Sequence, residues 1–275
     1  MTPFWSPAPV LVTGPCVLEG DEVNLAVADV LAELSTKLGL RVVFKASFDK
    51  ANRSAPGAAR GPGLGRGLEQ LARVREHSGL PVLTDVHEAG QVAPVARVVD
   101  ALQVPAFLCR QTDLLVAAGA SGRPVNLKKG QWMAPEDMLG AVEKVRTAGG
   151  VDVAVTERGT AFGYGDLVVD MRSFARLRRA TSAVVLFDAT HSVQQPGRGP
   201  DGSSGGSREH VPALLAAAAA AGADGFFLET HPTPASAPSD GASMWPLAGL
   251  VELVERAVEV WHAGRAKAPA AWAGG

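Results

Sequence analysis

The sequence predicts a closed (β/α)8 barrel, the TIM-barrel fold, built by a single domain of 275 residues. About eight short apolar runs alternate with helical patterns along the whole chain. Several of these runs end abruptly in charged or metal-ligating side chains, and such barrels build their active sites at the carboxyl ends of their strands. The chain has no linker and no shorter internal repeat. An open doubly wound sheet is the alternative arrangement.

The first four strand–helix units follow from apolar runs and turn residues. A loose lead-in over residues 1–9 is expected before the first strand, and Asp21 suits the N-cap of the next helix. Leu68, Leu71 and Val74 have helical spacing after the second strand. Strands are expected at 10–13, 42–44, 81–87 and 101–104, and helices at 21–38, 68–74, 91–98 and 114–118.

The second half of the chain repeats this alternation. Pro135 stands where a helix would begin, and a Gly-Gly pair at 149–150 would end it. The next helix has a basic last turn, which the helix dipole favours. Strands are expected at 125–130, 151–155, 183–187 and 225–228, and helices at 135–148, 170–179, 208–221 and 247–261, with a loose end at 265–275.

The composition narrows the classes of protein that fit. Hydrophobic residues make up 47% of the chain and the formal net charge is −2, so we expect a globular protein that binds neither nucleic acid nor a membrane surface. No apolar run is long enough to span a bilayer, and no signal-peptide pattern is present at the N-terminus. With only Cys16 and Cys109, a reducing cytoplasm is expected and a disulfide framework is not.

A cluster of cations is predicted at the mouth of the barrel. Lys45, Lys50 and Arg53 lie within nine residues directly after a buried strand, and Lys128 and Arg158 end two further strands. Because unpaired buried charge is costly, a ligand that carries a phosphate and a carboxylate would explain the cluster. The alternatives are a solvated basic loop, or a structural network in which these cations pair with nearby carboxylates.

A metal site is also possible at the mouth. Cys16, His191 and Glu229 end the first, seventh and eighth strands, and Asp240 follows in the last loop. The first and eighth strands are neighbours in a closed barrel, so these side chains can meet. Thiolate, imidazole and carboxylates together suit a divalent ion such as Zn²⁺ or Fe²⁺. Taken singly, a cysteine such as Cys16 is more often a small, buried apolar residue than a metal ligand.

The glycine-rich loop at 195–207 precedes a helix. Backbone amides at a helix N-terminus bind anions, and a flexible loop suits a closing lid. An ordinary surface connection is the alternative. Cys109 is interpreted as a structural thiol.

Ten segments, in order and over most of the chain, match one family closely. The segments are GPC (14–16), FKASFDKANRS (44–54), TDVHE (84–88), QVPAFLCRQTD (103–113), NLKKGQ (126–131), TERG (156–159), FGY (162–164), DATHSVQ (188–194), SGG (204–206) and ETHP (229–232). The chain resembles 3-deoxy-D-manno-octulosonate 8-phosphate synthase, which condenses phosphoenolpyruvate with arabinose 5-phosphate.

The resemblance implies a role for each matching residue. The phosphoenolpyruvate site would comprise Lys45, Ser47, Lys50, Lys128 and Arg158. The arabinose 5-phosphate site would comprise Asn52, Arg53 and Ser54. The resemblance also implies that Asp85 and His191 are catalytic and that Gln103 and Pro105 contact substrate.

The resemblance further implies a metal cofactor and a homotetramer. The metal-dependent branch of the family has a cysteine at the position of Cys16, where the other branch has asparagine. A divalent ion (Zn, Fe or Mn) would be bound by Cys16, His191, Glu229 and Asp240. A neighbouring subunit would also reach the sugar phosphate. The chain departs from the family at 55–59, where Ala-Pro-Gly-Ala-Ala replaces a serine- and histidine-containing stretch beside the sugar-phosphate site.

Three other functions are compatible with parts of this pattern. The related synthase that uses erythrose 4-phosphate typically has a Lys-Pro-Arg motif where this chain has Lys50 to Arg53. A Schiff-base aldolase on the same fold would use Lys45 or Lys128 as nucleophile. A non-catalytic sugar-phosphate binding protein would have no need of the candidate metal ligands.

Overall fold

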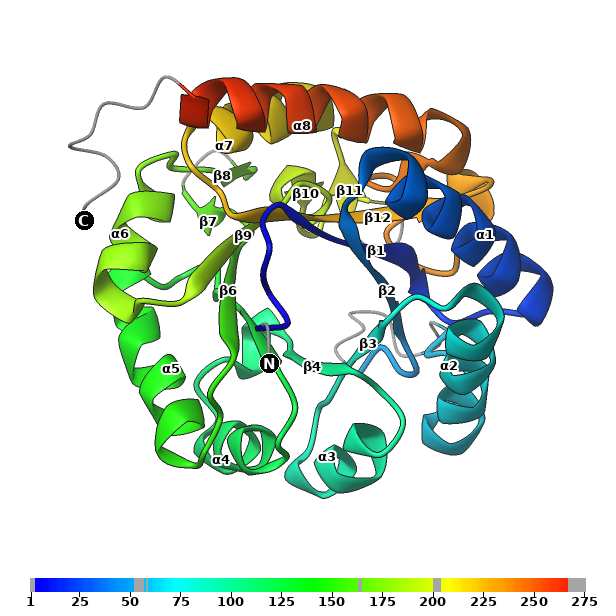
Figure 1. Cartoon of the computed structure of the whole chain (residues 1–275), viewed down its shortest axis with the longest axis horizontal. Coiled ribbons are helices and arrows are strands. Elements are labelled where there is room, and N and C mark those ends of the chain that lie inside the picture. Colours follow the sequence, from blue (N-terminus) through cyan, green and yellow to red (C-terminus); the bar gives the residue numbers. More distant parts are fainter. Residues whose placement is uncertain (1–2, 52–56, 58, 163–164, 200–203, 267–275) are drawn as a thin grey trace.

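The computed structural model describes residues 3–51, 57, 59–162, 165–199 and 204–266. These residues form a ring of strands surrounded by helices (Figure 1). The barrel strands are β1 (Val10–Val17), β2 (Arg41–Ser47), β3 (Val82–Asp85), β4 (Ala101–Val104), β5 (Val125–Lys128), β6 (Val153–Glu157), β9 (Val184–Asp188) and β12 (Gly225–His231).

The sheet closes on itself between its first and last barrel strands. Neighbouring strands are parallel and follow chain order, and β1 pairs with both β2 and β12. Val10 is thus opposite Arg41 on one side and Gly225 on the other. A side chain at Gly225 would clash, since a Cβ there would lie 2.4 Å from the Val10 carbonyl oxygen. Closure confirms the predicted single (β/α)8 barrel and excludes the open doubly wound sheet.

One helix follows each barrel strand on the outside of the ring (Figure 1). The helices are α1 (Asp21–Leu38), α2 (Leu64–Ser78), α3 (Ala89–Ala96), α4 (Thr112–Ala120), α5 (Met138–Thr147), α6 (Ser173–Thr181), α7 (Val211–Ala220) and α8 (Leu250–Ala266). The expected N-cap at Asp21 was wrong, because Gly20 is the cap and Asp21 lies in the first turn. Among the described helices, none combines the length and apolar character needed to cross a membrane.

Short elements lie in the loops that follow β6, β9 and β12. They are the strands β7 (Thr160–Ala161), β8 (Leu167–Val168), β10 (Gln194–Gln195), β11 (Gly205–Gly206) and β13 (Trp245–Pro246). The glycine-rich loop predicted at 195–207 therefore begins and ends in the β10–β11 hairpin. Its residues 200–203 lie outside the described part of the chain.

The strands bury both of their faces. Val10 and Val12 belong to a small apolar cluster inside the barrel, whereas Leu11 between them belongs to the larger core under the helices. This alternation is the period of two that a β-strand imposes on its side chains. Phe227 reaches the same inner cluster from β12. The barrel centre is therefore packed, and ligands can bind only at its ends.

The expected loose lead-in was wrong for residues 3–9. Trp5 is 1% exposed and belongs to the inner cluster, and its Nε1 donates a hydrogen bond to the Asp152 carbonyl at 3.3 Å. The N-terminal segment lies within the ring of strands (Figure 1). It closes the amino-terminal end of the barrel. At the other terminus, α8 continues to Ala266, so the predicted loose end at 265–275 did not begin where expected.

Replacing Trp5 with alanine should destabilise the barrel strongly. Truncation of a fully buried tryptophan costs about 3–5 kcal/mol of unfolding free energy, because it removes apolar contacts and leaves a cavity. Urea denaturation measures this loss. The Phe4→Ala variant is the comparison, since Phe4 is only partly buried and should cost less. Equal losses in the two variants would contradict the role of Trp5 as the closing residue.

Candidate active site

Lys45 occupies the centre of the barrel mouth, and its side chain is 2% exposed. Its Nζ donates to the Cys16 carbonyl and to Ser47 Oγ, both at 3.1 Å, and to Glu229 Oε1 at 3.2 Å. Asp85 Oδ2 lies 3.5 Å away. Burial alone would lower the pKa of Lys45, but the carboxylates of Asp85 and Glu229 outweigh it and the pKa is raised. Lys45 is therefore a fixed cation held between two acids.

A network of hydrogen-bonded polar side chains lies inside the barrel beside Lys45. Ser47 Oγ and Gln103 Nε2 both donate to the Asp85 carboxylate. Asn126 Nδ2 donates to Gln103 Oε1 at 2.8 Å, and Thr156 Oγ1 donates to Asn126 Oδ1 at 2.7 Å. Each of these residues comes from a different barrel strand, β2 to β6. The chain of hydrogen bonds fixes the carboxylate of Asp85, which in turn orients Lys45.

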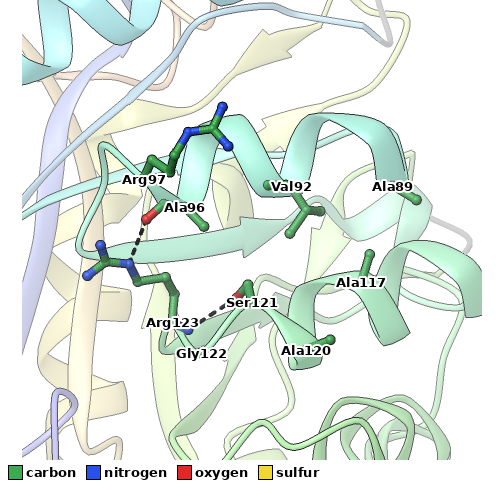
Figure 2. Close-up of a pocket in the computed structure, with 10 residues that line it drawn as sticks. Ala89, Val92, Ala96, Arg97, Ala117, Ala120, Ser121, Gly122 and Arg123 are labelled. Atoms are coloured by element: carbon green, nitrogen blue, oxygen red, sulfur yellow. Dashed lines mark hydrogen bonds between the residues drawn. The ribbon is translucent and has the colours of Figure 1, made fainter.

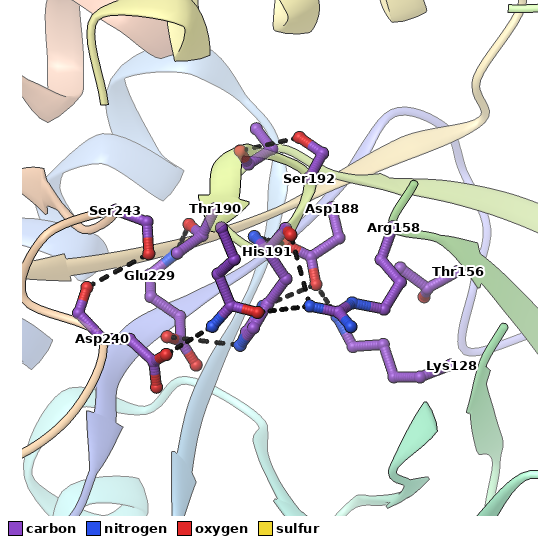
Figure 3. Close-up of polar contacts among 12 residues, drawn as sticks. Lys128, Thr156, Arg158, Asp188, Thr190, His191, Ser192, Glu229, Asp240 and Ser243 are labelled. Atoms are coloured by element: carbon purple, nitrogen blue, oxygen red, sulfur yellow. Dashed lines mark hydrogen bonds and ion pairs between the residues drawn. The ribbon is translucent and has the colours of Figure 1, made fainter. Parts of the chain in front are cut away.

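The amine of Lys128 lies against the carboxylate of Asp188 (Figure 3). Its Nζ donates to Asp188 Oδ2 and stands 3.0 Å from the centre of the Phe227 ring. His191 Nδ1 bonds the same carboxylate oxygen at 2.7 Å, and the His191 amide donates to Asp188 Oδ1 at 2.8 Å. Burial lowers the pKa of Lys128 to about 8, although Asp188 acts in the opposite direction. Asp188 thus links a cation to a histidine.

Arg158 completes the group of buried cations (Figure 3). Its Nη2 donates to Gln194 Oε1 at 2.5 Å and to the His191 carbonyl at 3.2 Å. The side-chain nitrogen of Gln194, Nε2, donates to Asp240 Oδ1. Gln194 therefore connects Arg158, which directly follows β6, to the loop after β12. Lys45, Lys128 and Arg158 thus stand at the carboxyl ends of β2, β5 and β6, on the same side of the barrel.

Cys16, Glu229 and Asp240 each place one potential ligand atom within 4.8 Å of the others. Cys16 Sγ lies 3.1 Å from Asp240 Oδ2. Glu229 Oε2 is buried and has no hydrogen-bond partner among the described residues, and His191 Nε2 lies 3.8 Å from it. Burial and the charge of Glu229 raise the pKa of the Cys16 thiol well above its ordinary value. The thiol would bind a cation only after losing its proton.

The backbone is unusual at two of these positions. Cys16 has φ 63° and Asp240 has φ 55°, values in the left-handed region that side chains rarely adopt. Next to Cys16, the pairing of β1 with β2 shifts between Thr13 and Cys16. Gly14 within this irregularity leaves no room for a side chain, since a Cβ would lie 2.1 Å from the Lys45 carbonyl oxygen. Such strain gathers at functional sites, where the surrounding structure enforces it.

Two comparisons with known proteins identify the family. Residues 7–263 match the sequence model of the DAHP synthetase I family. The chain belongs to this family. Among curated relatives, a 2-dehydro-3-deoxyphosphooctonate aldolase of Nitratidesulfovibrio vulgaris strain DP4 is 56% identical over 251 residues, covering 91% of each chain. Enzymes of the same name are 56% identical in Bradyrhizobium diazoefficiens (90% of this chain, 87% of the relative) and 55% identical in Rhodopseudomonas palustris strain TIE-1 (90% and 86%).

Not every predicted site residue of this family member joins the central cluster. Pro105 directly follows β4 and is the N-cap of a short 3₁₀ helix. Lys50, just beyond β2, does lie beside the cluster, because Cys16, Glu229 and Asp240 outweigh the effect of burial and raise its pKa. The predicted sugar-phosphate residues Asn52, Arg53 and Ser54 lie outside the described residues. Cys109 packs against Met133 with its Sγ 3.3 Å from the Met133 Sδ, in keeping with a structural thiol.

The structural ion network considered as an alternative is present, but only in part. Asp85 pairs with Lys45, whereas Asp49 pairs with Arg60 at the surface. Asp188 and Gln194 were not selected from the sequence, although both stand in one of the matching motifs. A charged residue at the end of the seventh strand was the available signal for Asp188. Nothing local marks Gln194, because its two partners come from distant strands and loops.

A groove of about 900 Å³ lies away from this mouth, between α3 and α4 (Figure 2). Half of its ten lining residues are alanine, and Arg97 and Arg123 lie at one end (Figure 2). Arg123 Nε donates to the Ala96 carbonyl at 2.7 Å, so this guanidinium is already engaged within the protein. The groove has no acid, histidine or cysteine among its lining residues. It contributes nothing to the chemistry of the mouth.

Proposed function

We propose that this chain condenses phosphoenolpyruvate with D-arabinose 5-phosphate and water, giving 3-deoxy-D-manno-octulosonate 8-phosphate and inorganic phosphate. The name of these relatives, 2-dehydro-3-deoxyphosphooctonate aldolase, refers to the same sugar-acid phosphate. The observation that carries the proposal is the convergence of the buried cations Lys45, Lys128 and Arg158 on one mouth. A small ligand with both a phosphate and a carboxylate is the natural counterpart of such a site.

The reaction forms a bond between C3 of phosphoenolpyruvate and the aldehyde carbon of the sugar. Water adds at C2, and the C–O bond to the phosphate breaks, so phosphate leaves with the bridging oxygen. Lys45, Lys128 and Arg158 hold the phosphate and carboxylate and neutralise their charge while the two carbons approach. The fixed hydrogen bonds of Lys45 keep it in place without reorganisation. The motif from Asn52 to Ser54 is proposed, from the sequence, to hold the sugar phosphate.

We further propose that Cys16, His191, Glu229 and Asp240 hold a divalent metal ion such as Zn²⁺, Fe²⁺ or Mn²⁺. The buried Glu229 Oε2, which has no hydrogen-bond partner in the described part of the chain, and the mixed donor set both fit a cation. His191 bonds Asp188 through Nδ1 and turns Nε2 toward Glu229, the arrangement in which a carboxylate orients a ligating imidazole. When bound, the ion would supply Lewis-acid chemistry to the site.

We propose that the protein works in the cytoplasm as a homo-oligomer, a tetramer by resemblance. Both cysteines are free and buried, which suits a reducing compartment. Phe107 and Trp132 are 56% and 52% exposed and their ring centres lie 5.9 Å apart. Exposed aromatic side chains of this kind are typical of protein interfaces.

Phosphate release from phosphoenolpyruvate tests the reaction. Arabinose 5-phosphate and erythrose 4-phosphate are compared as acceptors, each with EDTA and with added Mn²⁺ or Zn²⁺. We expect turnover with arabinose 5-phosphate and none with erythrose 4-phosphate. EDTA should abolish this turnover, and added metal should restore it. Turnover only with erythrose 4-phosphate would assign the chain to the related synthase. No turnover with either acceptor would indicate that the departure at 55–59 has changed the sugar site.

The alternative mechanism, a Schiff base between a lysine and the substrate, can be tested on the same protein. The raised pKa of Lys45 keeps that amine protonated and unsuitable as a nucleophile. Lys128 has the lowered pKa that such chemistry needs, but its amine is bonded to Asp188. We therefore expect borohydride to trap no lysine adduct with substrate, as judged by the intact mass of the protein.

The affinity for phosphoenolpyruvate should fall as pH rises through about 8. The pKa of Lys128 in the free protein is about 8, so its amine is charged below this pH and neutral above it. The dependence of kcat/KM for phosphoenolpyruvate on pH reports this group in the free enzyme. In the Lys128→Arg variant the alkaline fall should disappear, because guanidinium stays charged. An unchanged alkaline fall in that variant would assign it to another group.

A further inference from the structure

Lys129 and Glu157 are buried charges for which the proposed reaction has no direct use. Their side chains are 0% and 2% exposed, and Lys129 Nζ lies 3.5 Å from Glu157 Oε1. Each is the immediate chain neighbour of a cation in the mouth, Lys129 of Lys128 and Glu157 of Arg158. Since side chains alternate along a strand, the pair points away from the mouth while those cations point into it.

The Lys129 amine joins the two loops that follow β5 and β6. It donates to the carbonyls of Gly130 and Met133, at 3.3 and 3.2 Å, and to Thr160 Oγ1 at 3.2 Å. Each of the three N–H groups of the Lys129 amine therefore has an acceptor, and the Glu157 carboxylate lies close enough to balance the charge. On the other side, Glu157 Oε1 accepts the Gly159 amide at 2.7 Å.

Backbone hydrogen bonds extend this connection. The Lys129 amide donates to the Thr156 carbonyl at 2.9 Å, and the Ala161 amide donates to the Gln131 carbonyl at 2.9 Å. The loops are thus joined on both sides of the ion pair. Any shift of one loop relative to the other would change the separation of Lys128 and Arg158.

We propose that Lys129 and Glu157 are positioning residues that set the spacing of Lys128 and Arg158 for one phosphoenolpyruvate molecule. This inference rests on the proposed function, in which those two cations hold that substrate. Stability alone gives little reason for the pair, because well-packed apolar residues often replace a buried ion pair without loss of stability. A rigid separation between two cations is what a small ligand with two anionic groups requires.

The test uses Lys129→Met, Glu157→Gln and the double variant carrying both changes. Lys129→Met leaves Glu157 buried without its cation, so its thermal midpoint should fall most. The double variant removes both charges and should recover much of that loss. It still lacks the three hydrogen bonds from the Lys129 amine. The exposed pair Lys37 and Glu255, 2.5 Å apart, allows matched Lys37→Met and Glu255→Gln controls.

Calorimetric titration with phosphoenolpyruvate and steady-state kinetics provide the readouts. In the double variant we expect Kd and KM for phosphoenolpyruvate to rise about 10-fold, a typical effect of changing residues behind a binding group. The sugar KM should stay nearly constant, and the control variants should match the wild type. If the pair were purely structural, the double variant would regain both its thermal midpoint and its affinity for phosphoenolpyruvate. This result would overturn the proposal.

The two proposals fail in different ways. A wild-type protein that binds no phosphoenolpyruvate would overturn both the proposed function and the role of the pair. A wild-type protein that binds it, with unchanged Kd in a folded double variant, would overturn only the role of Lys129 and Glu157. Calorimetry separates these results because it needs no turnover and no sugar.

Discussion

Replacing Lys45 with methionine is expected to reduce kcat/KM for phosphoenolpyruvate by about 10³-fold, the scale of removing one partner from a buried charged contact. Lys45 has fixed surroundings, since four oxygens lie within 3.5 Å of its Nζ. Methionine keeps an unbranched side chain that is one heavy atom shorter, and it lacks the charge and the N–H donors of lysine. Phosphate release at varied phosphoenolpyruvate concentration measures the effect.

The same change should also lower stability. Asp85 and Glu229 would lose their common cation, at a cost of about 3–5 kcal/mol of unfolding free energy. Circular dichroism at the assay temperature must therefore show that the variant is folded. Lys37→Met is the control, because Lys37 is an exposed lysine paired with Glu255 far from the mouth. Near-normal turnover in a folded Lys45→Met protein would contradict a role for this lysine in binding or catalysis.

The Cys16→Ser variant is expected to bind a divalent metal about 10²–10³-fold more weakly, since one soft ligand of four is lost. Cobalt is the informative probe, because a thiolate ligand gives Co²⁺ a charge-transfer absorption that a hydroxyl does not. Burial raises the pKa of the Cys16 thiol, so metal binding should release its proton and tighten as pH rises. Proton release in weak buffer on addition of Zn²⁺ measures this directly.

Cys109→Ser is the matched control for the metal experiment. Cys109 is the other buried free thiol, and it packs against Met133 rather than near Glu229 or Asp240. Its variant should keep the Co²⁺ absorption and the proton release of the wild type. If the absorption persists in Cys16→Ser and disappears in Cys109→Ser, the proposed ligand set is wrong.

The sequence alone determined the barrel and the rim of its active site. Alternating apolar runs with polar ends are properties of neighbouring residues, so the positions of Lys45, Asp85, Lys128 and Arg158 at strand ends were predictable. Parallel strands in a closed barrel all end on the same side. The convergence of these side chains therefore followed from the fold class without knowledge of any contact.

The tertiary structure decided which partner each group has. Lys128 meets Asp188 and Gln194 meets Asp240 only because barrel closure and register bring distant segments together. In the sequence, Lys128 and Lys129 are adjacent and equivalent, yet one faces the mouth and the other joins two loops. Trp5 likewise stands in a segment that the sequence predicts to be loose, yet it belongs to the apolar cluster inside the barrel. Periodicity and residue chemistry are local, whereas pairing and burial depend on the whole chain.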